Sequence, residues 1–152
     1  PSFLDFMLLI FLFRKNFPTF FIHKEQYWSV FHFFLKDLEQ IPAVNGSLAK
    51  AEEVLKEGLP LFIFPEGKRS RGKVGEFRSG VAVLAEKFPF VSVVPVGIGG
   101  AENVWPRANA LPHFLAGRRI KVSIGDCLKY ADFGDKEMFL AILKQKITEL
   151  SS

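Results

Sequence analysis

Apolar positions along the chain recur with helical spacing in some segments and with strand spacing in others, and the two kinds of segment alternate. The predicted helices are Ser2–Phe13, Gln26–Leu38, Ser47–Glu57, Ser79–Phe88 and Lys136–Leu150. The predicted strands are Thr19–His23, Leu61–Phe64, Val91–Ile98 and Ile120–Ile124. We expect Leu61–Phe64 to be buried and Val91–Ile98 to be buried on both faces, since both are continuous apolar runs. The alternation predicts an α/β fold with a largely parallel central sheet flanked by helices.

Local signals mark several ends of these elements. Ser2 and Asp5 have the spacing of a capping box at the start of the first helix. Pro42 interrupts the pattern after the second helix, and Gly58 ends the third. The residues show no linker or repeat, so we expect one domain over 1–152. In such a fold, ligands bind beyond the carboxyl ends of the strands.

Composition narrows the class of protein. Hydrophobic residues make up 49% of the 152 positions and charged residues 24%, which excludes disorder for lack of core material. The longest apolar run, Phe6–Phe13, has eight residues, whereas a membrane span needs about 20. The single cysteine, Cys127, has no internal partner for a disulfide, which favours a reducing compartment. Because the chain opens at Pro1 directly into apolar residues, we expect a fragment or processed chain.

The charge is concentrated in one place. The net charge is +4, and the segment Lys68–Arg78 holds five cations against one acid, so this segment accounts for the whole excess. A local patch of this kind favours binding of a phosphate or an anionic surface. Aromatic residues do not interleave with these cations, which argues against nucleic acid as a partner.

The loop after Leu61–Phe64 combines a carboxylate, a glycine and several cations. Arginine can grip phosphate oxygens in bidentate fashion, lysine adds a point charge, and glycine permits close approach of the backbone. The residues alone also allow a solvated basic turn in which Glu66 pairs with its neighbours. The candidate substrate-binding residues are Glu66, Gly67, Lys68, Arg69, Ser70 and Arg71.

These residues carry a resemblance to a known family. Phe64-Pro65-Glu66-Gly67 followed by Lys68-Arg69-Ser70 resembles the third signature block of the glycerolipid acyltransferases, which include lysophosphatidic acid and glycerol-3-phosphate acyltransferases. Lys68 stands where a threonine is commonest. The stretch Val93-Val94-Pro95-Val96 resembles another of the family's blocks. Between the two blocks, Phe77-Arg78-Ser79-Gly80 resembles the start of the helix that family members carry there. The resemblance covers nearly the entire chain.

The resemblance also implies a catalytic residue. The family's catalytic block is Asn-His-x-x-x-x-Asp, often close to Asn-His-Pro-Ser-Phe-Leu-Asp, and this chain begins Pro1-Ser2-Phe3-Leu4-Asp5. It implies that the catalytic histidine directly precedes Pro1, that Asp5 orients its imidazole, and that the chain without this histidine is inactive. From spacing alone, Asp5 completes the capping box, and the two roles are compatible.

What the resemblance implies is an O-acyltransferase of phospholipid biosynthesis. It would move a fatty acyl group from acyl-CoA or acyl-carrier protein, as co-substrate and with no other cofactor, to the hydroxyl of a lysophospholipid such as 1-acylglycerol 3-phosphate. It implies work at the cytoplasmic side of a membrane, the protein being peripheral or anchored by a missing upstream segment. Asn45 stands where the family carries an arginine, which leaves the acceptor open. No metal site is expected, since His23 and His113 have no partner at metal-ligand spacing.

One alternative from a different class stays open. The Lys68–Arg78 patch also suits a non-catalytic module that binds anions or a membrane surface. Such a module would bind vesicles in a salt-dependent manner and would transfer no acyl group.

Overall fold

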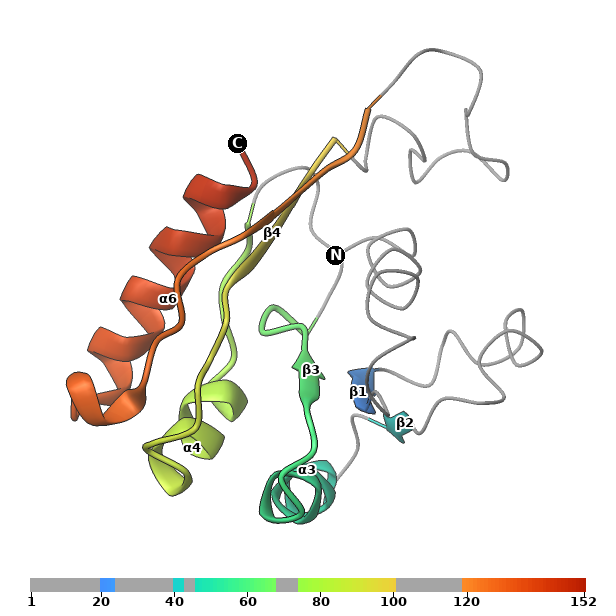
Figure 1. Ribbon diagram of the computed structural model, residues 1–152, viewed down its shortest axis with the longest axis vertical. Coiled ribbons are helices and arrows are strands. Elements are labelled where there is room, and N and C mark those ends of the chain that lie inside the picture. Colours follow the sequence, from blue (N-terminus) through green and yellow to red (C-terminus); the bar gives the residue numbers. More distant parts are fainter. Residues whose placement is uncertain (1–19, 24–39, 43–45, 68–73, 101–118) are drawn as a thin grey trace.

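The computed structural model describes residues 20–23, 40–42, 46–67, 74–100 and 119–152. It shows strands and helices interspersed along the chain (Figure 1). The elements are β1 (Phe20–His23), β2 (Gln40–Pro42), α3 (Ser47–Lys56), β3 (Leu61–Ile63), α4 (Gly80–Lys87), β4 (Val96–Gly99), β5 (Lys121–Ile124), the 3-10 helix η2 (Tyr130–Asp132) and α6 (Lys136–Leu150). The mixed α/β character expected from the sequence is confirmed.

Three strands form a parallel sheet in the order β2-β1-β3. Its central strand pairs with both neighbours, so that His23 is opposite Pro42 and Ile22 is opposite Ile63. Because β2 and β3 run in the same direction on either side of β1, the chain needs a crossover between them, and α3 provides it. The carboxyl ends of all three strands therefore meet at one edge of the sheet.

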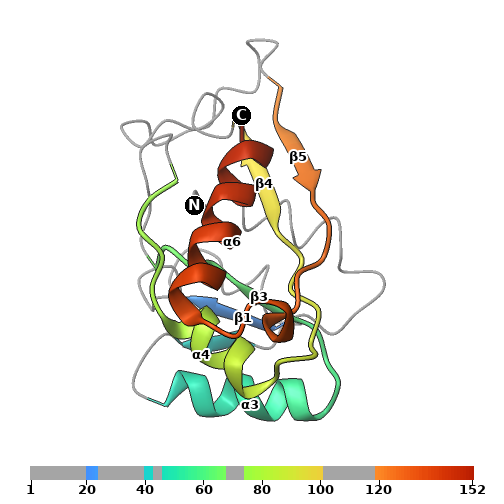
Figure 2. The ribbon, with the colours of Figure 1, turned by 90° about the vertical axis from the view of Figure 1, so that its left-hand side faces the viewer.

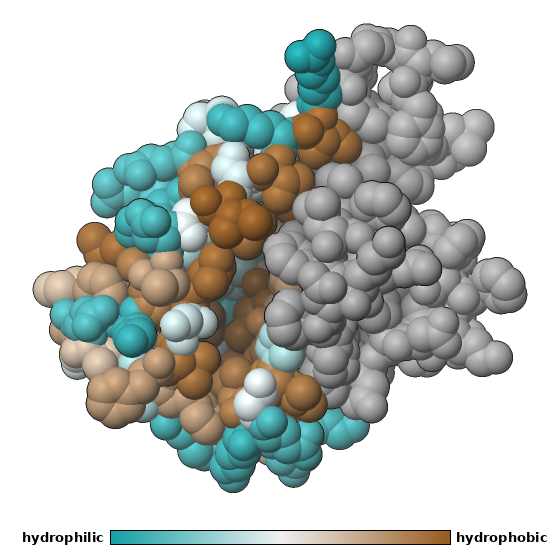
Figure 3. Space-filling view, in the orientation of Figure 1, coloured by the Kyte–Doolittle hydropathy of each residue, from teal (hydrophilic) through white to brown (hydrophobic). Residues whose placement is uncertain are grey.

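The remaining strands form a separate antiparallel pair, β4 with β5, in which Val96 is opposite Ile124. The carboxyl-terminal end of α6 lies against this pair so closely that a Cβ atom on Gly97 would overlap Leu150. Figure 2 shows α6 lying along β4 and β5. Ile124 of β5 is 59% exposed and Val94, two residues before β4, is 49% exposed. Hydrophobic residues lie along these strands in Figure 3.

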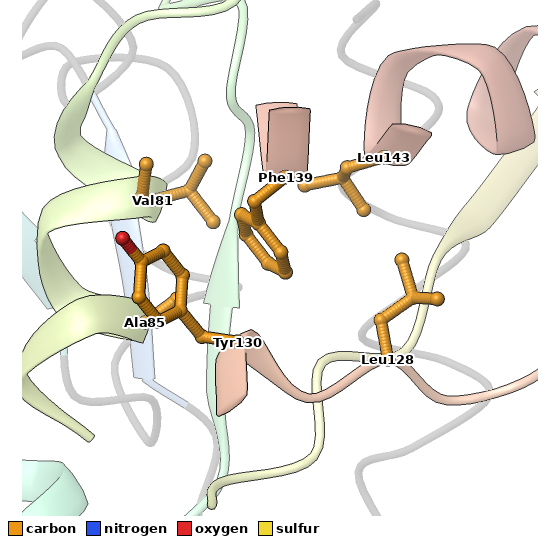
Figure 4. Packing of buried hydrophobic residues seen from close by; sticks show 7 residues of the cluster. Val81, Ala85, Leu128, Tyr130, Phe139 and Leu143 are labelled. Carbon is orange, nitrogen blue, oxygen red and sulfur yellow. The ribbon is translucent and has the colours of Figure 1, made fainter. Parts of the chain in front are cut away.

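The main core lies between α4, η2 and α6. The ring of Phe139 is fully buried and packs edge-on against Tyr130, with ring centroids 5.6 Å apart (Figure 4). It also packs edge-on against Phe133, at 5.8 Å. Other buried residues of this cluster are Val81, Ala82, Ala85, Leu128 and Leu143. The predicted helix Lys136–Leu150 is confirmed at both ends, and Asp135 caps it by accepting a hydrogen bond from the backbone N–H of Met138 at 2.7 Å.

A smaller cluster joins the two helices that flank β3. Ala51 and Val54 of α3 pack with Leu84 of α4. Ile63, the last residue of β3, packs against both this cluster and the main core. The strand that leads into the Phe64–Gly67 segment is therefore held from both sides by buried apolar side chains, which fixes the point from which that segment starts.

Several expected elements are confirmed with shifted ends. Helix α3 ends at Lys56 rather than Glu57, and α4 lies one residue inside each end of Ser79–Phe88. Strand β1 matches the described part of the predicted Thr19–His23, and β5 starts one residue after Ile120. Strand β3 was expected to be buried, but its three side chains are half-buried.

Three expectations about strands are wrong or incomplete. The segment Val91–Ile98 is not one strand buried on both faces: β4 begins only at Val96, and before it a single bridge joins Val93 to Leu128. Pro95 lacks an N–H, which limits pairing at that point. The short strand β2 was missed because its third residue is Pro42; a proline is tolerated there since β2 lies at an edge among the described strands. The described strands also form two sheets, one of them antiparallel, rather than one.

Some expectations fall outside the described residues. They are the helices Ser2–Phe13 and Gln26–Leu38, and the candidate site residues Asp5, Lys68, Arg69, Ser70 and Arg71.

Candidate functional site

The candidate site starts where β3 ends. Phe64, Pro65, Glu66 and Gly67 turn the chain away from the sheet, and the N–H of Gly67 donates to the carbonyl of Phe64 at 3.1 Å. Gly67 has a φ of 58°, in the left-handed region that favours glycine. The sequence therefore places a glycine where this tight turn requires one.

A later segment returns to this turn and binds it at two points. The backbone N–H of Arg78 donates to the carbonyl of Pro65 at 2.8 Å. The backbone N–H of Gly75 donates to Oε2 of Glu66, also at 2.8 Å. Glu66 is half-buried. The carboxylate of Glu66 thus holds the chain that leads into α4. We call the turn Pro65, Glu66 and Gly67, together with Gly75 and Arg78, the clasp.

Both glycines of the clasp leave space that a neighbour fills. A Cβ atom on Gly75 would lie 2.8 Å from Oε2 of Glu66, too close to keep the present hydrogen bond. A Cβ atom on Gly67 would lie 2.6 Å from Nε of Arg78. Side chains at these positions would therefore push Glu66 or Arg78 away from the turn.

The register of the parallel sheet brings a second part of the sequence to the same edge. The last residues of β1 and β2, His23 and Pro42, lie opposite each other, and Ile63 is opposite Ile22. The stretch that ends with Ile41 and Pro42 therefore lies beside the strand that leads into the Phe64–Gly67 turn. More than twenty residues separate the two stretches along the chain.

The structure places two of the seven candidate site residues, Glu66 and Gly67, and the other five lie outside the described residues. Sequence reasoning missed Gly75 as the partner of Glu66, and the sequence holds no signal for that pairing. It counted Arg78 in the basic patch but not as a neighbour of Gly67. The Phe77-Arg78-Ser79-Gly80 stretch was the signal that could have found it.

The described part of the chain lacks two features. No group of three or more His, Cys, Asp or Glu side chains is arranged there to hold a metal ion. No helix in that part combines the length and the apolar character needed to cross a bilayer.

Comparison with known proteins gives consistent matches. The sequence profile of the family described as Acyltransferase matches residues 1–99. A chloroplast 1-acyl-sn-glycerol-3-phosphate acyltransferase from Arabidopsis thaliana is 40% identical over 60 residues, which are 39% of this chain and 17% of that protein. Its counterpart from Brassica napus is 38% identical over 60 residues, with the same two shares. The matched stretch thus spans less than a fifth of either relative.

A solved structure is similar as well. The crystal structure of the 1-acyl-sn-glycerophosphate acyltransferase PlsC from Thermotoga maritima matches with a TM-score of 0.69 and 26% identity, over 87% of this chain and 55% of that one. The profile match extends over well more than half of the chain and includes Asp5, the clasp and β4. The chain belongs to the acyltransferase family.

Proposed function

We propose that this protein is an O-acyltransferase of phospholipid biosynthesis. It takes a fatty acyl group from acyl-CoA or acyl-carrier protein and transfers it to the hydroxyl of a lysophospholipid, with 1-acylglycerol 3-phosphate as the expected type of acceptor. The observation that carries the proposal is the family match over residues 1–99, which includes Asp5 and the whole clasp. The names of the relatives and the similarity to PlsC support the acceptor class.

The proposed reaction needs no covalent enzyme intermediate. The acceptor oxygen attacks the thioester carbonyl, a C–O bond forms, and the C–S bond breaks. The proton of the acceptor hydroxyl passes to the histidine of the Asn-His-x-x-x-x-Asp block and then to the departing sulfur, which leaves as a thiol. Asp5 holds the imidazole in position and stabilises its charged form.

In this proposal the substrate-binding residues begin at the clasp and continue into the segment that follows Gly67. Glu66 and Gly67 lie just beyond the carboxyl end of β3, where parallel sheets bind their ligands. The cations that follow, Lys68, Arg69 and Arg71, together with Ser70, supply donors for a phosphate group. Glu66 acts here as a positioning residue, because its carboxylate holds the backbone of Gly75.

We extend the proposal to the setting of the enzyme. A lysophospholipid acceptor resides in a bilayer, so the protein works at a membrane surface, on the cytoplasmic side where acyl-CoA and acyl-carrier protein are found. We also propose a largely parallel central sheet for the whole fold, supported by the two parallel pairings of β1.

The test is a thiol-release assay with lysophosphatidic acid and acyl-CoA. The chain is measured as it stands and with Asn-His added before Pro1; turnover is expected only with the added histidine. The matched control carries Asn-Ala in place of Asn-His. If no thiol is released with any lysolipid tried, the proposed activity is wrong.

The same preparations test the alternative of a non-catalytic module. That alternative predicts binding to anionic vesicles that weakens with salt and no thiol release even when Asn-His is present. Release that depends on the added histidine rules it out.

A further inference from the structure

Arg78 lies against the turn that carries the family's third block. Its backbone N–H donates to Pro65, and its side chain passes over Gly67, so that a Cβ atom on Gly67 would be 2.6 Å from Nε, 2.7 Å from Cδ and 3.1 Å from Cζ. The guanidinium therefore lies over Gly67, in space that a Cβ atom at this position would occupy. Eleven positions separate the two residues along the chain.

Arg78 forms no ion pair with a carboxylate in the described part of the protein. Two other cations show the contrast: Lys87 pairs with Glu52 and Lys136 pairs with Glu86. Arg78 is exposed, and no ion pair joins it to a carboxylate among the described residues. Arginine stays charged at every physiological pH, so this position keeps a full positive charge available to a ligand.

On these observations, and resting on the proposed function, we infer that Arg78 binds a phosphate monoester of a substrate, with Gly67 holding the guanidinium in place. A planar guanidinium can donate two parallel hydrogen bonds to a phosphate, which a lysine cannot do. Phosphate monoesters occur in both proposed substrates, as the headgroup of lysophosphatidic acid and as the 3′-phosphate of CoA. The two sources are separated by experiment.

The competing role for Arg78 is purely structural. Its aliphatic stem covers Gly67, and arginine stems commonly pack in this way without any ligand. Arg78→Met keeps most of that aliphatic stem and removes the charge. Arg78→Lys keeps the charge but removes the planar guanidinium that can donate two parallel hydrogen bonds. The matched control is Arg119→Met, because Arg119 is also exposed but precedes β5 and lies outside the clasp.

The first measurement is binding to phosphatidylcholine vesicles that contain either lysophosphatidic acid, a monoester, or lysophosphatidylcholine, a diester. Loss of a bidentate charged contact lowers affinity about tenfold or more. We expect Arg78→Met to show this loss for lysophosphatidic acid alone, Arg78→Lys to be intermediate, and Arg119→Met to bind as the original chain does. The second measurement compares CoA with dephospho-CoA; a loss confined to CoA assigns the site to the donor instead.

A double-mutant cycle tests the part played by Gly67. If Gly67 holds the guanidinium, Gly67→Ala displaces it, and adding Arg78→Met to Gly67→Ala then costs little further affinity. Fully additive effects would remove Gly67 from the inference. Thermal unfolding of each variant shows whether it is folded.

The outcomes separate this inference from the proposed function. If Arg78→Met binds both monoesters as the original chain does, or loses monoester and diester binding equally, the inference is wrong while acyl transfer can still be present. If no lysolipid supports thiol release, the proposed function fails whatever Arg78 does.

Discussion

The clasp and the main core are held together by different forces. Around Phe139, the contacts are apolar, fully buried and made between α4, η2 and α6. Around Glu66, the contacts include two hydrogen bonds from the backbone of a later segment, and the side chains are half-buried or exposed. The core thus depends on side-chain volume, whereas the clasp depends on backbone donors and on positions where no side chain is present.

This difference separates stability from function. A core of interlocking rings tolerates little change in volume, so substitutions there change the free energy of unfolding. The clasp buries little apolar surface, so substitutions there should change the position of Glu66 and Arg78 more than they change stability. The following predictions test this division, from the largest expected effect to the smallest.

Phe139→Ala should lower the free energy of unfolding by about 3–5 kcal/mol, because it removes a fully buried ring and leaves a cavity. Urea unfolding measures the loss. Met138→Ala is the control on the same helix, since Met138 is 55% exposed, and should change stability by no more than about 0.5 kcal/mol. Equal losses at the two positions would contradict the assignment of the core.

Gly75→Ala should reduce kcat/KM for lysophosphatidic acid about tenfold or more, because the new Cβ atom displaces the carboxylate of Glu66. Glu66→Ala should cost most of the activity, and the double variant should be little worse than Glu66→Ala alone. Steady-state kinetics on the chain carrying Asn-His provide the measurement. The control is Gly80→Ala, where a Cβ atom would meet only Leu48, at 3.6 Å.

Asp135→Ala should lower stability by about 1 kcal/mol, since it removes the side chain that caps α6. The loss is measured as a shift of the urea midpoint at constant slope. Asp132→Ala is the matched control, because Asp132 is exposed and caps no helix. Activity per folded molecule should be unchanged, as α6 lies outside the clasp.

The ion pair between Lys136 and Glu86 should give a small pH effect on stability. The hydrogen bond to Glu86 raises the pKa of Lys136 above 10.5. Because the folded state holds the proton more tightly, this contribution is complete below pH 10.5 and is lost as pH rises through the raised pKa. Thermal melts of the original chain and of Lys136→Met should converge at the alkaline end of the series; a constant difference would contradict the prediction.

Local pattern predicted most of the helices and some of the strands. Helix α6 was predicted at both ends because its apolar residues recur every three or four positions. Strand β2 was missed because three residues carry no periodicity and Pro42 is read locally as a break. The strand predicted over Val91–Ile98 was too long. The composition of this segment favours a strand throughout, but among the described residues it pairs only from Val96 onward and at the single bridge of Val93.

Some features of the candidate site were also predicted from the sequence and others were not. Glu66 and Gly67 were predicted from their residue types and from the block that they form. The hydrogen bond from Gly75 to Glu66 could not be predicted from the sequence. Its donor is the backbone N–H of Gly75, and every non-proline residue carries the same donor.

By itself, the sequence determined the family of this protein, the amphipathic helices and the identity of the residues at the end of β3. Those are properties of neighbouring residues, which residue type and spacing express directly. Only the tertiary structure decided that β2 and β3 flank β1, that Gly75 holds Glu66, and that Arg78 lies over Gly67. Such contacts join residues that are not neighbours in the chain, so residue type and local spacing do not express them.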